Sequence, residues 1–253
     1  MTIDPVFWSV VALAAIVVGL AKSGLMNSLG MIGVPLLTLV MPARDAAGMM
    51  LPVLLCMDAV AFVSYRKSVN RPLLMLMLPG AMIGIGIAWA LSSMISDEVV
   101  TLLLGIITLM FVLDAWLPLR KKLEGLPPSR AWGTFWAGLA GISSFFFFND
   151  TATTEIYTLP QKMEPRIYAG TSVWFFTILN VVKLVPYFAL GQINISSLEI
   201  SAVAAPIGIL AVALGIWLVH RISTKAFYQI AYSLMFVISL KLIYDGARGT
   251  FGF

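Results

Sequence analysis

The chain has 253 residues, of which 60% are apolar and 11% are charged, and its mean hydropathy is +0.97. A soluble protein of this length has no place for so many apolar side chains, because its surface needs more polar ones. The composition therefore predicts an all-α, polytopic integral membrane protein, with the lipid bilayer as its first partner. The net charge of +4 mostly reflects loops that face one side of the membrane, and it does not indicate nucleic-acid binding.

The apolar residues fall into runs separated by short polar segments. These runs are 6–21, 28–41, 46–65, 72–95, 98–119, 131–148, 167–190, 197–219 and 226–244. A helix of about 20 residues crosses the hydrocarbon core, so most runs are long enough, and the first two are short. We expect about 8 transmembrane helices, and up to about 10 helical segments with broken or re-entrant ones included. No basic region precedes the first run and no small-residue cleavage site follows it, so we expect it to be retained.

A faint repeat relates residues 5–120 to residues 130–245, with the same order of apolar runs. At a spacing of 122 residues Gly19 pairs with Gly141, Arg44 with Arg166, Gly48 with Gly170, Asp58 with Asn180 and Tyr65 with Tyr187. Trp89 and Trp217 then pair at a spacing of 128, which indicates a slightly longer loop in the second copy. Internal repeats of this kind are typical of membrane transporters. We expect one membrane domain made of two repeats, residues 1–125 and 126–253.

The basic residues favour one topology. If residues 6–41 and 131–160 each form a helix pair or re-entrant hairpin with both ends on one side, eleven basic residues face one side of the membrane and only Arg44 and Arg248 the other. The eleven are Arg66, Lys67, Arg71, Arg120, Lys121, Lys122, Arg130, Lys162, Arg166, Arg221 and Lys225. If each region crosses once as a broken helix, the division is eight against five. The positive-inside rule favours the first arrangement, with both termini outside a bacterial inner membrane and the two repeats inverted.

The stretch from Gly19 to Pro35 is the expected hinge of the first repeat. Its glycines and closing proline do not suit a straight helix that faces lipid. Irregular backbone at membrane depth is tolerated where it is buried in protein or lines a wet cavity. A helix that restarts near Ser28 would aim N–H groups into that cavity, which suits an anion. The alternative is that the glycines only allow close helix packing.

Few ionisable residues stand inside apolar runs, and each needs a physical reason. Asp58 lies in the middle of one run, and its repeat counterpart Asn180 shares a helix face with Lys183. In a functional interpretation Asp58 carries a proton and Lys183 binds an anion. In a structural interpretation the two form a buried ion pair that holds two helices together.

No cofactor and no metal site is expected. The chain has one histidine, His220, beside a basic loop residue, and one cysteine, Cys56, in an apolar run. This excludes an internal disulfide and a thiolate metal cluster, and leaves no nucleophile with a base and no carboxylate-pair motif for an intramembrane enzyme. No ATP-binding motif is present. We therefore expect a protein that is not an enzyme.

One segment breaks the pattern of the second half. Residues 145–148, all Phe, lead into the polar, β-favouring string 149–158, where the repeat predicts a second glycine-rich hinge. The string also matches one reading frame of a widely used short-read sequencing adapter. Our hypothesis is that native residues here were replaced during sequence assembly without a change in length; finding the same codons in a re-amplified gene would contradict it. The literal alternative is a Thr-rich substrate loop that carries Asp150 and Glu155.

Several short pieces occur in a characteristic order along nearly the whole chain. They are Gly19-Leu20-Ala21-Lys22-Ser23-Gly24-Leu25, Gly33-Val34-Pro35-Leu36-Leu37, Leu51-Pro52 with Asp58, Gly141 to Phe145, Tyr157 to Lys162, and Ala169-Gly170-Thr171 with Asn180 and Lys183. In these pieces the chain resembles the TauE/SafE-type sulfite exporter family of bacterial membrane proteins. The resemblance implies export or exchange of small sulfur oxyanions or organosulfonates. It also implies a His-Ala-Gly-Gly-Pro-Pro run before Tyr157, a pattern from which residues 146–158 depart.

Together these features predict a secondary transporter of a small anionic solute, and by the resemblance an exporter, that works by alternating access. The expected substrate-binding residues are Lys22, Ser23, Gly24, Asn27, Ser28, Gly30, Gly33, Asn180 and Lys183. Lys22 and Lys183 would neutralise the anion, and Asp58 would couple the cycle to protons. The alternatives are a non-transporting membrane assembly subunit and an anion channel, and a homo-oligomer is compatible with either.

Overall fold

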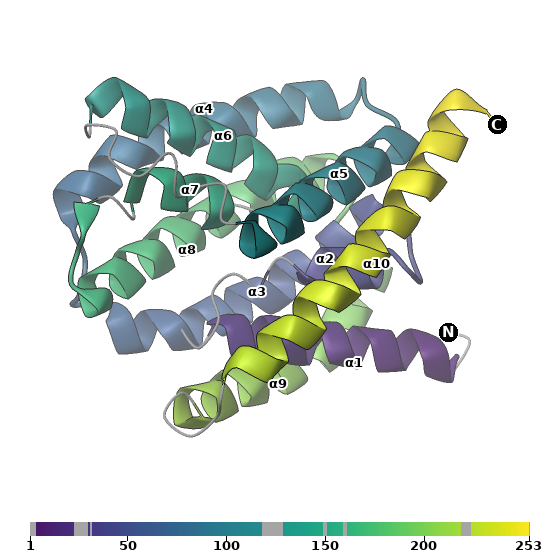
Figure 1. Ribbon diagram of the computed structural model, residues 1–253, viewed down its shortest axis with the longest axis horizontal. Coiled ribbons are helices and arrows are strands. Elements are labelled where there is room, and N and C mark those ends of the chain that lie inside the picture. The colour runs from purple at the N-terminus through teal and green to yellow at the C-terminus, as the bar shows by residue number, and fades with distance from the viewer. Residues whose placement is uncertain are drawn as a thin grey trace.

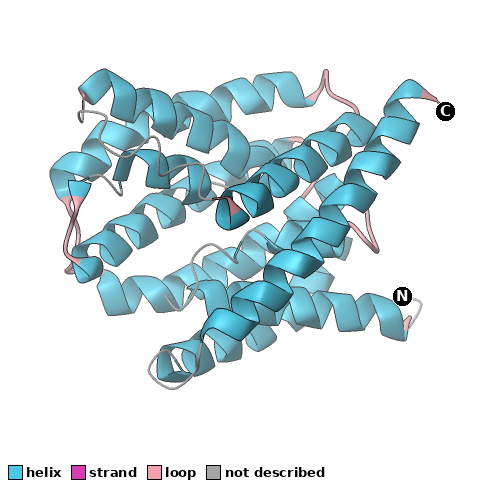
Figure 2. Cartoon of the chain, viewed as in Figure 1, coloured by secondary structure: helices cyan, strands magenta, loops and turns pink. Residues whose placement is uncertain are grey.

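The computed structural model describes residues 4–22, 30, 32–117, 129–148, 151–158, 161–218 and 224–252. Within these ranges all regular secondary structure is helical, as Figure 2 shows. The predicted all-α, polytopic class is therefore confirmed.

Ten helices are described, and their order is the same in the two halves of the chain. The first half contains α1 (Pro5–Leu20), α2 (Gly33–Leu37), α3 (Ala43–Tyr65), α4 (Arg71–Ser92) and α5 (Asp97–Trp116). The second half contains α6 (Arg130–Phe147), α7 (Thr151–Thr158), α8 (Pro165–Ala189), α9 (Ile195–Leu218) and α10 (Thr224–Phe251). In each half one helix precedes a short helix and three long helices.

Five of the described helices are long and apolar enough to cross a membrane: α3, α4, α5, α8 and residues 195–215 of α9. The apolar helix α1 is shorter, at 16 residues. The total number of crossings, about 8, stays a prediction.

Polar caps define where several of these apolar helices begin. The Asp4 carboxylate accepts a hydrogen bond from the Val6 amide, directly before Pro5 at the first helical position of α1. Asn70 caps α4 by accepting from the Leu73 amide, and Asn194 accepts from the Ser197 amide at the start of α9. Such caps satisfy amides that have no partner within the helix, which matters most where water is scarce.

The halves pack mainly on each other rather than on themselves (Figure 1). Helix α6 lies along α4 and α1 lies along α9. Helix α3 contacts both α8 and α9, and α8 also contacts α4. Helix α5 runs beside α10. In helix order α1 corresponds to α6 and α4 corresponds to α9. The α1–α9 contact and the α6–α4 contact are therefore equivalent between the two halves.

Glycines permit the closest of these approaches. A Cβ at Gly19 of α1 would lie 2.6 Å from the Gly208 carbonyl oxygen of α9, and one at Gly141 of α6 would lie 2.1 Å from the Ala81 carbonyl oxygen of α4. Both distances are far below van der Waals contact, so no larger residue fits without displacing backbone. Small residues at helix interfaces are the usual means of close packing in membranes.

The contacts define two opposite ends of the bundle. At the first, which we call the Arg44 end, Arg44 of α3 donates to the carbonyl oxygens of Ser92 and Ile95 and pairs with Asp97 at an Nε–Oδ1 distance of 2.8 Å. Close approaches of Gly48 to the Gln192 carbonyl and of Gly249 to Glu98 bring the α8–α9 turn and the last turns of α10 to this end as well.

The opposite end, which we call the Arg66 end, holds the α3–α4 turn and the start of α8. The Trp174 indole donates to the Arg66 carbonyl oxygen, and the Asn70 amide donates to the Thr171 hydroxyl. A Cβ at Gly170 would lie 1.6 Å from the Ser68 carbonyl oxygen. Helices α3 and α8 therefore run in opposite directions between the two ends.

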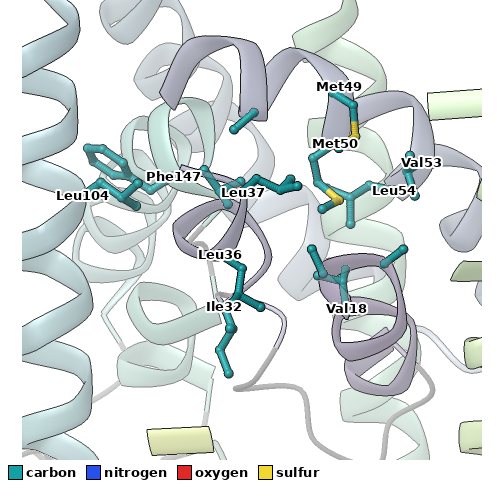
Figure 3. Close-up of a cluster of buried hydrophobic side chains, with 14 of the residues drawn as sticks. Val18, Ile32, Leu36, Leu37, Met49, Met50, Val53, Leu54, Leu104 and Phe147 are labelled. Carbon is teal, nitrogen blue, oxygen red and sulfur yellow. The ribbon is translucent and has the colours of Figure 1, made fainter. Parts of the chain in front are cut away.

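One of two described apolar clusters gathers around α2, between α1, α3 and α5 (Figure 3). Val18, Leu37, Met50 and Val53 are almost fully buried there. Gly33, at the start of α2, packs so closely on α1 that a Cβ would lie 2.4 Å from the Val18 side chain. Burial of these side chains fixes the short helix α2 beside the end of α1, next to the polar residues described below.

Candidate functional site

A cluster of three polar side chains lies where the end of α1 meets α3 and α8. The Asp58 carboxylate receives the Lys22 ammonium at 2.5 Å on one oxygen and the Asn180 side-chain amide at 2.6 Å on the other. The Asp58 side chain is only 2% exposed, and that of Lys22 is 19% exposed. We call these three residues the Asp58 cluster. A buried carboxylate is tolerated because both of its oxygens are paired.

The contact between Asp58 and Asn180 joins residues 122 apart, the spacing at which the sequence pairs them. Two residues at equivalent positions of a repeat can touch only near the axis that relates the two copies. Asn180 and Lys183 were expected to share a face of one helix, and both are buried on α8.

Lys183 lies in a second cluster with Ser144 and Phe148. Its ammonium donates to the Ser144 carbonyl oxygen at 3.1 Å and to the Ser144 hydroxyl at 3.0 Å, and stands 3.8 Å from the centre of the Phe148 ring. The Lys183 side chain is fully buried. Phe148 has a φ of 51°, a left-handed conformation that glycine adopts far more easily. We call these three residues the Ser144 cluster.

The structural interpretation in which Asp58 forms an ion pair with Lys183 is wrong. Asp58 pairs with Lys22 instead, because the break after α1 brings Lys22 against the middle of α3. Lys183 bonds Ser144, at the last turn of α6, and so ties α6 to α8.

Sequence reasoning missed Ser144, although the repeat contains the signal for it. At the spacing of 122, Ser144 is the counterpart of Lys22. Lys22 lies at the end of α1 and is paired with Asp58 of α3. Ser144 lies in the last turn of α6 and is bonded to Lys183 of α8. In the first half the ammonium belongs to the break and in the second it belongs to the long helix.

Of the other predicted site residues, Ser23, Gly24, Asn27 and Ser28 lie outside the described residues. Gly30 has ordinary space around it, since a Cβ there would lie 3.6 Å from the Ala21 side chain, and Gly33 is in close contact with Val18. Helix α1 ends at Leu20 and α2 begins at Gly33. The Phe176 ring of α8 has its centre 5.8 Å from the Lys22 ammonium.

The string expected to favour β-structure is helical where it is described. Residues 151–158 form α7, which packs on α6, and the Tyr157 ring fills the space that a Cβ at Gly133 would occupy. The Tyr168 hydroxyl donates to the Glu155 carboxylate at 3.4 Å. Asp150, named with Glu155 in the literal alternative, lies outside the described residues.

The described residues hold no group of three His, Cys, Asp or Glu side chains that could bind a metal ion. The polar atoms brought together at the end of α1 are an ammonium, a carboxylate and an amide. This set combines hydrogen-bond donors with acceptors.

The profile of the family described as "Sulfite exporter TauE/SafE" matches residues 11–242, nearly the whole chain. The chain belongs to this family. It is therefore a multi-pass membrane protein of a transporter family, as the apolar helices also indicate. Neither a curated protein nor a solved structure matches the chain.

Proposed function

We propose that this protein is a secondary transporter that exports a small sulfur oxyanion or organosulfonate by alternating access, and that the Asp58 cluster is part of its substrate and coupling site. The observation that carries the proposal is the Lys22–Asp58 ion pair, in which the Asp58 carboxylate is buried and Lys22 lies directly after the end of the apolar helix α1. Ionisable residues inside a membrane bundle are expensive and usually mark a solute or proton pathway. The family supplies the chemical class of the solute.

In this proposal Lys22 and Lys183 provide positive charge and Asp58 exchanges a proton. The Lys22 ammonium has three N–H donors, and Asp58 accepts from one of them. In this proposal the anion accepts from the other donors. When Asp58 takes up a proton, its attraction for Lys22 is lost and the ammonium becomes available to an anion. Proton uptake and anion binding would then favour each other.

The inverted repeat is the second part of the proposal, and three observations support it. The packing of α1 on α9 parallels that of α6 on α4. Gly48 and Gly170, which the repeat pairs, both lie against the carbonyl of a turn, at Gln192 and Ser68. Asp58 and Asn180 meet each other, as equivalent residues on an axis do. Inverted repeats allow a central site to open to either side of the membrane in turn.

The proposed orientation places the Arg66 end in the cytoplasm of a bacterial inner membrane. The starts of α3 and α8 lie at opposite ends, as the hairpin topology requires. The Arg66 end carries Arg66, Lys67 and Arg71 near the α3–α4 turn, and the Arg44 end carries Arg44 and Arg248. The positive-inside rule then puts both termini outside.

Transport of radiolabelled sulfite into proteoliposomes tests the proposal. We expect uptake that saturates and that is accelerated by unlabelled sulfite inside the vesicles, because a carrier exchanges bound solute across the membrane. Lys22→Met is expected to lower uptake at least about tenfold, by removing a charge from the site. The matched control is Lys241→Met, which breaks an exposed Lys–Asp pair on α10.

The outcomes separate the alternatives. Saturable uptake without acceleration by internal sulfite would indicate a channel. No uptake by a folded protein would favour a non-transporting subunit. Equal loss in both lysine variants would remove Lys22 from the site.

A further inference from the structure

Two buried oxygen atoms on α8 have no hydrogen-bond partner among the described residues: the Asn180 side-chain carbonyl and the Thr177 hydroxyl. Asn180 is 2% exposed, so its carbonyl oxygen lies away from bulk water. Residues three apart on a helix stand on neighbouring positions of one face, so both atoms belong to the face that carries the Asp58 cluster. A buried acceptor without a partner costs free energy, and such an atom in a native protein calls for an explanation.

The orientation of the Asn180 amide follows from its partner. Asp58 accepts hydrogen bonds on both carboxylate oxygens, one from the Lys22 ammonium and the other from Asn180. Asn180 must then turn its NH₂ group toward Asp58, as it does at 2.6 Å. Its carbonyl oxygen is consequently directed elsewhere, as an acceptor that needs a donor.

The nearest donors that the described residues leave unused belong to Lys22. One ammonium hydrogen is directed to Asp58, and Lys22 makes no other polar contact with the described residues. Among the described residues, the Asp58 cluster thus offers further donors from Lys22, and α8 offers acceptors from Asn180 and Thr177 that have no partner. A bare cation would suit the two oxygens but would leave the remaining Lys22 donors without an acceptor. The complementary solute is an anion that also carries a hydrogen-bond donor.

We infer that the site selects small oxyanions that keep a hydrogen-bond donor, such as a monoprotonated oxyanion or a sulfonate with a hydroxyl group, over anions with acceptors only. In this arrangement the anionic oxygens accept from Lys22. The O–H or N–H group of the solute donates to the Asn180 carbonyl oxygen or to the Thr177 hydroxyl. The inference deepens the proposed function and depends on it.

A matched pair of ligands tests the inference directly. Binding of 2-hydroxyethanesulfonate and of ethanesulfonate to the detergent-purified protein is measured by the ligand-dependent rise in melting temperature. We expect the hydroxylated ligand to bind about tenfold more tightly, the effect of one hydrogen bond to an otherwise unsatisfied acceptor. Equal affinities in this pair, together with sulfite binding that does not depend on sulfite's own protonation, would overturn the inference and leave the proposed function standing. Failure of every anion, sulfite included, to bind the folded protein would overturn both.

Variants assign the selectivity to α8. Thr177→Val deletes a free hydroxyl at nearly constant volume, and it is expected to reduce the preference for the hydroxylated ligand several-fold. The control is Thr108→Val on α5, the same change at a buried threonine whose hydroxyl already donates to the Leu104 carbonyl oxygen at 2.7 Å. A preference unchanged in Thr177→Val, or reduced equally in both variants, would contradict the assignment.

Sulfite provides a second arm, because it exchanges its last proton near neutral pH. We expect sulfite to bind more tightly below this transition than above it, while ethanesulfonate, which has no such proton, changes far less over the same range. Selectivity in the organic pair alone would identify the donor as a group of an organosulfonate. Selectivity in the sulfite arm alone would identify it as the acid proton of the oxyanion.

Discussion

At the scale of single residues, Asp58 connects the polar side chains at the end of α1 and on α8. Its two carboxylate oxygens hold Lys22 from the break after α1 and Asn180 from α8. Removing one partner of a buried ion pair leaves an uncompensated charge, whereas removing both replaces the pair with neutral groups. The two kinds of change therefore have different costs, and this difference can be measured.

We predict that Lys22→Met and Asp58→Asn each lower the free energy of unfolding by about 3 kcal/mol, and that the double variant is more stable than either single one. Chemical unfolding in detergent, followed by tryptophan fluorescence, measures these values. Lys241→Met with Asp245→Asn is the control cycle, because this pair is 54% and 44% exposed. Each of its members is expected to cost at most about 0.5 kcal/mol. Additive effects at Lys22 and Asp58 would mean that the pair does not form.

Sequence reasoning reached Asp58, Asn180 and Lys183 because charged and amide groups stand out in apolar runs. One of its two interpretations paired Asp58 with Lys183, whereas Asp58 pairs with Lys22. Whether Lys22 or Lys183 reaches Asp58 depends on how the chain turns after α1, which periodicity does not reveal. Ser144 was missed because a serine is unremarkable in a membrane helix.

At the scale of helices, the fold depends on a few positions where backbone meets backbone. Gly48 of α3 and Gly170 of α8 each face the carbonyl of a turn that joins two other helices. The sequence predicted the apolar runs, and α1 ends at Leu20, inside the stretch expected to be a hinge. The role of the hinge glycines stays a prediction. The sequence did not predict that the string 151–158 forms a helix, because local preference for β-structure is overridden by packing of α7 on α6.

We predict that Gly170→Ala lowers the melting temperature by several degrees. Its Cβ would lie 1.6 Å from the Ser68 carbonyl oxygen, so α8 or the α3–α4 turn must shift, at a cost of about 1–3 kcal/mol. The matched control is Gly86→Ala in α4, where nothing lies within 4 Å of the added Cβ. There the better helix propensity of alanine should leave the melting temperature equal or slightly higher. A similar drop for both variants would contradict the close contact at Gly170.

At the scale of the whole molecule, the two ends of the bundle differ in charge. The α3–α4 turn at the Arg66 end is rich in basic residues, and the Arg44 end uses its arginine to hold the α4–α5 turn. The sequence alone favours one of two topologies by the number of basic residues on each side, because it does not show which loops lie together. The contacts place the α3–α4 turn beside the start of α8, and the α4–α5 and α8–α9 turns beside the start of α3.

We predict that Lys67→Cys is protected from a membrane-impermeant maleimide in intact cells and that Arg248→Cys is labelled. Both are made in a Cys56→Ala background, which removes the one native cysteine. Labelling of both positions in permeabilised cells is the control for accessibility. The opposite pattern would invert the orientation, and labelling of both in intact cells would contradict the assignment of these residues to opposite sides.

The meeting of Asp58 with Asn180 has a consequence for how such a chain could have arisen. In a dimer of identical subunits, the side chains that face each other across the twofold axis have to be the same. Two carboxylates there would repel each other, and two amides would provide no charge for Lys22. A single chain with two copies is free of this restriction, so a mutation in one copy can set an acid against an amide. If the halves descend from a duplicated gene, fusion into one chain was the step that made a charged centre possible at the axis.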